Sequence, residues 1–283
     1  MCMSQSKQSK HRHISFTAHY TGYIWYQMGI SHEAFATSKG KALAQFAHPF
    51  ESMAEKFIGG SMRSTLKTRH TLLDDHLKLL IKQYPNLQIL EIAAGLSPRG
   101  WWFRSHYPEI DYRELDLPDM AATKQSALNK IDPESPKVLS ADLFTDDFKT
   151  AFDEFDPTRP LVIISEGLIN YFNQDLLKQL LNSIVRFGQP FQKLHYLTDL
   201  YPEPVQHKLA NLIWSSSKLL KYASRSAFTF HFKKPLEVQH FFKLAGFTEV
   251  EVIQPQLYFE KKNQNMDTDQ HLGDLVWMIH AIK

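Results

Sequence analysis

Four acidic residues stand at the ends of four successive apolar segments of the sequence. Glu91 lies in "LQILEIAA", Asp116 ends "IDYRELD", Asp142 follows "KVLSA" and Glu166 follows "LVIIS". In an open parallel sheet the carboxyl ends of the strands meet at one edge, and ligands bind at that edge. One such acid alone would commonly be a solvated strand end, but four together indicate a ligand site.

The turn after the first of these segments, "AAGLSPRG", looks like a nucleotide-binding loop without most of its glycines. A dinucleotide site uses the pattern G-x-G-x-x-G so that backbone N–H groups can approach a pyrophosphate. Only Gly95 is present here, and Pro98 has no N–H group to offer. Asp116 lies 21 residues after Gly95, an offset at which a carboxylate can accept hydrogen bonds from ribose hydroxyls. A ligand with ribose and adenine but no phosphate therefore fits best, and S-adenosylmethionine is such a ligand.

Apolar segments alternate with helical patterns from residue 64 to residue 201, which favours a parallel, doubly wound sheet. Ser97 is expected to cap the helix after the first strand, with Pro98 at its first position, and Asn173 to cap a later helix. The clearest helix covers residues 64–84, and its apolar face at spacings of three and four consists of Leu66, His70, Leu73, Leu77, Leu80 and Tyr84.

We therefore predict one α/β domain over residues 14–283, built on a seven-stranded, mostly parallel, Rossmann-like sheet. Residues 1–13 are expected to form a disordered tail, and residues 14–62 an N-terminal helical cap. Residues 201–230 interrupt the alternation with a helical pattern, so we expect a lid inserted after the fifth strand.

The composition limits the classes of partner. Lysine and arginine number 32 against 30 acidic residues, a formal net charge of +2, and no long block has one sign. This balance argues against nucleic acid and membranes as partners and favours a small molecule. The single cysteine excludes an internal disulfide, and residues 1–13 lack the apolar core of a signal peptide, so we expect a cytoplasmic protein. No metal site is expected.

Five stretches, in order and with ordinary spacing, resemble the leucine carboxyl methyltransferase family and its bacterial O-methyltransferase relatives. They are "TAHYTGY", "KTRHTLLDDHL", "ILEIAAGLSPRGWWFR", "YRELDLPDMAATKQSAL" and "ADLFTDDFKTAFDEFDPTRPLVIISEGLINYF". The similarity runs from about Thr17 to Asn182 and is weaker beyond. It implies a class I methyltransferase domain that transfers a methyl group from S-adenosylmethionine to a carboxylate or hydroxyl.

The resemblance also implies roles for matching residues at the methionine end of this cofactor. Arg69 would pair with the carboxylate of the methionine moiety as a two-pronged donor. Glu91 and Gly95 would line the same end. Glu166 would face the amino or sulfonium group, and Tyr171 would border the acceptor cavity.

At the adenosine end, the resemblance assigns the ribose to Asp116 and the adenine to Asp142 and Leu143, and Leu117 is expected to bind the cofactor as well. The chain departs from the family's pattern at two positions in the first turn. The family commonly has Gly where Ala93 stands, which is tolerable if this position needs no positive φ. It commonly has an acid where Ser97 stands, so one cofactor contact is in doubt.

The sequence leaves two classes of methyl acceptor open. A carboxylate is already a nucleophile, whereas a hydroxyl needs a base. Tyr171 and His195 are the candidates for a catalytic role. A small molecule is the first expectation for the acceptor, and the C-terminus of a protein is the second. Two other functions compete: an NAD-dependent oxidoreductase, favoured by the ribose acid but opposed by Pro98, and a non-catalytic Rossmann-type binding protein.

Overall fold

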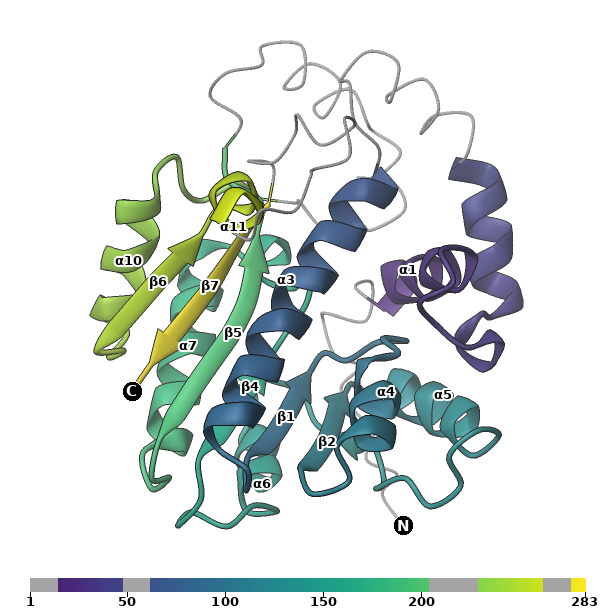
Figure 1. Ribbon diagram of the computed structural model, residues 1–283, viewed down its shortest axis with the longest axis horizontal. Helices are drawn as coiled ribbons and strands as arrows, with labels where there is room; N and C mark the ends of the chain where they lie inside the picture. Colours follow the sequence, from purple (N-terminus) through teal and green to yellow (C-terminus); the bar gives the residue numbers. More distant parts are fainter. Residues whose placement is uncertain (1–14, 48–61, 204–228, 262–275) are drawn as a thin grey trace, which may run out of the picture.

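The computed structural model describes residues 15–47, 62–203, 229–261 and 276–283. The predicted tail at 1–13 and most of the predicted lid at 201–230 lie outside these ranges. Within them, a central sheet lies between two layers of helices (Figure 1). None of the helices found there is both long and apolar enough to cross a membrane.

One seven-stranded sheet, with the strand order β3-β2-β1-β4-β5-β7-β6, occupies the centre of the described part. Its strands are β1 (Gln88–Ile92), β2 (Asp111–Asp116), β3 (Leu139–Ser140), β4 (Leu161–Ile164), β5 (Leu194–Leu200), β6 (Glu249–Ile253) and β7 (Trp277–Ile282). β7 runs antiparallel to β5 and β6, and the other neighbours pair in parallel. The predicted seven-stranded, mostly parallel sheet is confirmed. Its strand order reverses between β1 and β4, which is where open α/β sheets bind ligands.

Helices cover both faces of the sheet (Figure 1). One face carries α3 (Met62–Gln83), α4 (Arg99–His106) and α11 (Pro255–Lys261), and the other α6 (Asp147–Phe152), α7 (Gln174–Gly188) and α10 (Pro235–Leu244). Other elements are α1 (Ser15–Gln27), a helix over residues 38–47, α5 (Pro118–Leu128), and the short 3₁₀ helices η1 (Glu33–Phe35) and η2 (Ile169–Tyr171).

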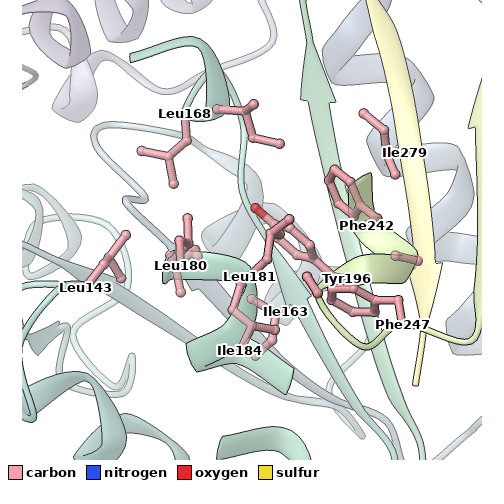
Figure 2. Packing of buried hydrophobic residues seen from close by; sticks show 14 of the residues in the cluster. Leu143, Ile163, Leu168, Leu180, Leu181, Ile184, Tyr196, Phe242, Phe247 and Ile279 are labelled. Carbon is pink, nitrogen blue, oxygen red and sulfur yellow. The ribbon is translucent and has the colours of Figure 1, made fainter. Parts of the chain in front are cut away.

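Helix α7 shows how the sequence builds the larger core. Its buried face is formed by residues that recur at helical spacing, Leu177, Leu180, Leu181 and Ile184. Figure 2 shows Leu181 and Ile184 beside Ile163 of β4 and Tyr196 of β5. The predicted cap is confirmed, because the Asn173 side chain accepts a hydrogen bond from the Leu176 amide at 2.9 Å.

Some predicted boundaries differ from the structure. The helix after β1 begins at Arg99, and Pro98 precedes it instead of occupying its first position. β3 has only two residues, although its segment is apolar over a longer stretch. The sequence predicted neither α6 nor α11, because helices of six and seven residues are too short to display a helical period.

Helix α1 lies directly on the turn that follows β1. A Cβ atom added to Gly22 would stand 2.7 Å from Cβ of Leu96, and one added to Gly95 would stand 3.0 Å from Cβ of Ala18. Contacts this short leave no space for larger side chains or for water between the two segments. The part of the predicted N-terminal cap that the structure describes therefore covers the edge of the sheet where the candidate site lies.

Candidate active site

Asp116 organises the turn after β1 from the end of the neighbouring strand. Its Oδ2 accepts a hydrogen bond from the Gly95 amide at 2.7 Å, and its Oδ1 accepts one from the Leu117 amide at 2.7 Å. The side chain is only 8% exposed. Burial raises the pKa of Asp116 to about 6, although the Gly95 and Leu117 amides favour its charged form. Each carboxylate oxygen keeps a second lone pair, so the group can still accept from hydroxyls.

Most amides of this turn already donate hydrogen bonds within the protein. Ala94 donates to the Leu115 carbonyl, Gly95 to Asp116, and Ser97 to the Ala94 carbonyl. The Arg99 amide donates to the Ser97 hydroxyl at 3.2 Å, but the cap of α4 is Pro98, so the predicted cap at Ser97 is wrong. The turn therefore offers a pyrophosphate few of the N–H groups that it needs.

Ala93 has a positive φ, so the condition under which alanine would be tolerable at this position is not met. Its φ is +50°, and Gly95 has the same value. A side chain in this left-handed conformation brings Cβ against the following carbonyl oxygen, which costs roughly 1–2 kcal/mol. The turn keeps its shape because the surrounding strands and the Asp116 carboxylate hold it, and Ala93 carries local strain.

The residues that the resemblance assigns to the adenosine lie next to one another across the strand ends. The Ala141 amide donates to the Asp116 carbonyl at 3.1 Å, which brings the segment after β3 alongside the end of β2. The Asp142 Oδ1 accepts from the Phe144 amide at 3.0 Å, and Leu143 is buried. The structure thus brings Asp116, Leu117, Asp142 and Leu143 together at one edge.

Arg99 lies at the centre of a buried charge cluster that sequence reasoning missed. Its side chain is fully buried. Nε donates to Asp74 of α3 at 2.6 Å, Nη1 to Glu91 of β1 at 3.0 Å, and Nη2 to Glu166 after β4 at 2.6 Å. The remaining oxygen of Glu91 accepts from the Tyr112 hydroxyl at 2.9 Å. Glu91 is therefore tied to the protein on both oxygens, and its predicted cofactor contact stays a prediction.

Glu166 joins this cluster to Arg69. Its Oε1 accepts from Arg69 Nε at 2.8 Å, and its Oε2 lies 2.9 Å from Nδ1 of His70. Burial alone would raise the pKa of Glu166, but His70, Arg99 and Arg69 together hold it well below its usual range. The sequence placed His70 on the apolar face of α3, whereas its ring in fact meets Glu166 and Asp74.

Gly167 allows the Arg69 guanidinium to lie flat over the chain. Gly167 has φ +68°, and a Cβ atom there would stand 2.9 Å from Arg69 Nη1 and 3.0 Å from Nη2. Arg69 Nη1 donates to the Tyr201 hydroxyl at 3.3 Å and lies 3.8 Å from Asp199 Oδ2. No hydrogen bond of its Nη2 is found in the described residues.

Asp199 is a second functional candidate that sequence reasoning missed. It lies on β5 and is 1% exposed, and its Oδ1 accepts from the Gly167 amide at 2.6 Å. Its Oδ2 has no hydrogen-bond partner among the described residues. Burial raises the pKa of Asp199, although Arg69 favours its charged form. Its place near the end of a strand, as with the four predicted acids, was the signal that could have identified it.

The two candidate catalytic residues lie in different places. The Tyr171 hydroxyl donates to the Thr17 hydroxyl of α1 at 3.3 Å, so Tyr171 joins η2 to the cap beside this cluster. His195 lies near the amino end of β5, opposite the edge that holds Glu166 and Asp199. Its Nδ1 lies 3.0 Å from Nε2 of His280, and its ring packs on Tyr84. The structure therefore does not bring His195 to the candidate site.

The sequence profile described as leucine carboxyl methyltransferase matches residues 30–185, more than half of the chain. The protein belongs to the leucine carboxyl methyltransferase family. The matched range contains the turn after β1, the Arg99 cluster and the residues expected at both ends of the cofactor, but it ends before Asp199. Members of this family are thus the appropriate comparison for the site.

Relatives agree with this membership over parts of their length. A Parafrankia sp. (strain EAN1pec) protein named "Putative S-adenosyl-L-methionine-dependent methyltransferase" is 30% identical over 138 residues, 47% of this chain and 44% of the relative. The "Tetracenomycin polyketide synthesis O-methyltransferase TcmP" of Streptomyces glaucescens is 24% identical over 117 residues, 40% of each chain. The match thus spans less than half the length of these relatives.

A solved structure supports the fold over nearly the whole chain. A "putative methyltransferase" from Thermobifida fusca superposes with a TM-score of 0.62 at 16% identity, covering 89% of this chain and 92% of that one. The likeness at this identity establishes the fold that the leucine carboxyl methyltransferase family membership implies.

Replacing Ala93 by Gly should stabilise the turn. Gly relieves the strain of a positive φ, and this gain exceeds the added freedom of the unfolded chain. We expect Ala93→Gly to raise the free energy of unfolding, measured by urea titration, by on the order of 0.5–1 kcal/mol. The matched control is Ala94→Gly, which has no positive φ to relieve and should lower the same quantity. A decrease for both variants would contradict the strain at Ala93.

The pair of His195 and His280 should make the fold acid-sensitive. Burial lowers the pKa of His195 to about 3 and that of His280 to about 4. The His280 imidazole lowers the pKa of His195 further, and His76 and Lys193 lower that of His280. An unfolded histidine titrates near 6.5, so unfolding takes up protons as the pH falls from about 6.5 toward 3. The stability that neutral imidazoles provide is therefore present above pH 6.5 and is lost through this window.

Urea unfolding between pH 7.5 and 5 tests this loss. We expect His195→Gln to reduce the slope of the unfolding free energy against pH by up to about 1.4 kcal/mol per unit. Adding His280→Gln should reduce the slope again. A slope that neither substitution changes would contradict the buried neutral pair.

Proposed function

We propose that the protein is an S-adenosylmethionine-dependent O-methyltransferase. The observation that carries the proposal is the turn after β1, in which the Gly95 amide donates a hydrogen bond to the Asp116 carboxylate and is not available to a phosphate. Such a turn suits a nucleoside ligand with a ribose and without a pyrophosphate. Membership of the leucine carboxyl methyltransferase family supports the same cofactor.

The donor set at the other end suits the amino-acid part of this cofactor. Arg69 has a guanidinium nitrogen without a hydrogen bond in the described residues, and Asp199 has a carboxylate oxygen without one. A carboxylate and an ammonium group are the natural complements of these two atoms. The adenosine end would lie against Asp116, Leu117, Asp142 and Leu143, and the methionine end against Arg69, Gly95, Glu91 and Glu166.

S-adenosylmethionine, when bound, supplies a methyl group on a sulfonium sulfur. In-line transfer of such a group depends mainly on alignment and exclusion of water, which buried and mutually fixed side chains provide. Arg99 and Glu166 hold Arg69 and the turn in place, and Tyr171 connects the cap to the same edge. None of these roles requires proton transfer, which agrees with a carboxylate acceptor, whereas a hydroxyl acceptor would need a base.

We further propose a small-molecule acceptor that presents a carboxylate or a hydroxyl, with the C-terminus of a protein as the alternative. The single cysteine supports a cytoplasmic setting. A screen of carboxylic acids and phenols for methyl transfer, followed by base treatment of the product, would separate the two acceptors. Methyl esters hydrolyse readily in base, whereas aryl ethers do not.

Calorimetry with S-adenosylmethionine, S-adenosylhomocysteine and NAD tests the cofactor. We expect both adenosyl compounds to bind and NAD not to bind. Asp116→Ala should weaken binding of the adenosyl compounds by on the order of 1–3 kcal/mol, because it removes charged hydrogen bonds to the ribose. Thermal unfolding of the variant controls for loss of the Gly95 and Leu117 contacts. Binding of NAD alone, or unchanged affinity in a folded variant, would contradict the proposal.

Binding should also depend on pH through Asp116. Ribose hydroxyls donate to the charged carboxylate, so they bind the form that predominates above its pKa of about 6. We expect the affinity for S-adenosylhomocysteine to be constant above about pH 7 and to fall by up to tenfold per unit below pH 6. In Asp116→Asn this step should disappear, and its persistence there would assign the titration to another group.

A further inference from the structure

Asp199 has a buried carboxylate oxygen without a hydrogen-bond partner in the described residues. The other oxygen is held by the Gly167 amide at 2.6 Å, which fixes the direction of the side chain. A buried acceptor without a partner is costly, so native proteins rarely retain one without a reason. The position of Asp199 beside Arg69 suggests that this reason is a ligand.

The charge around Asp199 favours a cation. The cluster contains the carboxylates of Asp74, Glu91, Glu166 and Asp199 against the guanidiniums of Arg69 and Arg99. The four carboxylates therefore outnumber the two guanidiniums by two. One positive charge on His70 would still leave one carboxylate in excess. A buried excess of one sign is unfavourable unless a group of the opposite sign joins it.

The unpartnered oxygen further requires an N–H or O–H donor. A sulfonium group carries a positive charge but no such hydrogen, whereas an α-ammonium group carries three. Arg69 Nη1 lies 3.8 Å from Asp199 Oδ2, and Arg69 Nη2 has no hydrogen bond in the described residues. An α-amino acid presents its ammonium and carboxylate groups on neighbouring atoms, so it can meet both residues at once.

Glu166 is less suited to this role, although the sequence pointed to it. Its two oxygens already accept from Arg69 and Arg99 and lie against His70. These contacts direct Arg69, so Glu166 acts as a positioning residue. Asp199 has no comparable set of donors, since its Oδ2 meets only Arg69 at a distance longer than a hydrogen bond.

We propose that Asp199 Oδ2 accepts the α-ammonium group of the cofactor's methionine moiety, while Arg69 pairs with the neighbouring α-carboxylate. This inference rests on the proposed function and adds a binding residue on β5 to it. Within the cluster, Asp199 then contacts the ligand, and Glu166 orients Arg69.

A cycle of two ligands and two proteins tests this contact by calorimetry. The ligands are S-adenosylhomocysteine and its analogue without the α-amino group, and the proteins are the wild type and Asp199→Asn. The asparagine keeps an oxygen for the Gly167 amide and removes the charge. We expect Asp199→Asn to weaken the binding of S-adenosylhomocysteine about ten- to a hundredfold and to change the affinity for the analogue less than about threefold.

Glu166→Gln is the matched control. This substitution should act through Arg69 and therefore weaken the binding of both ligands to the same extent. Equal effects of Asp199→Asn on the two ligands would overturn the proposal and leave Asp199 as a partner of Arg69 alone. A selective loss in Glu166→Gln would also overturn it, as would a loss of methyl transfer in Asp199→Asn with unchanged binding. If the wild type bound neither adenosyl compound, the proposed function itself would fail, a result distinct from these.

Discussion

The interaction on which the candidate site depends is the pairing of one buried guanidinium with three carboxylates. Arg99 reaches Asp74 on α3, Glu91 on β1 and Glu166 after β4 from the first turn of α4. A charge withdrawn from water is tolerated only when its donors are satisfied, and here every nitrogen of the guanidinium has an acidic partner. Because these partners come from separate elements, Arg99 fixes the spacing among them.

The remaining parts of the site follow from this arrangement. Glu166, kept ionised by its neighbours, directs Arg69 over Gly167, where the missing side chain gives the guanidinium its space. Behind the turn, the buried Lys124 pairs with Glu114 at 2.6 Å and donates to the Ala94 carbonyl at 3.2 Å. The strained turn is thus held by two hydrogen bonds: Lys124 donates to its Ala94 carbonyl, and Asp116 accepts from its Gly95 amide.

The sequence was informative wherever local pattern decides the structure. The period of α3, the cap at Asn173 and the alternation of strands with helices could be derived from neighbouring residues. The partners of Arg99 could not, because they are 8, 25 and 67 residues away and meet only when the sheet forms. His70 matched an apolar period by position, and only the tertiary fold turns it to Glu166. The positive φ of Ala93 similarly reflects its surroundings and not its own preference.

The close seating of α1 on the turn connects the cap to the site energetically. Ala18 and Gly22 meet the segment that carries Gly95 and Leu96, so the cap cannot leave without uncovering that edge of the sheet. Opening of the cap and dissociation of a ligand held by the turn are then linked equilibria. A bound ligand would slow amide hydrogen exchange in α1, although the helix itself need never touch it.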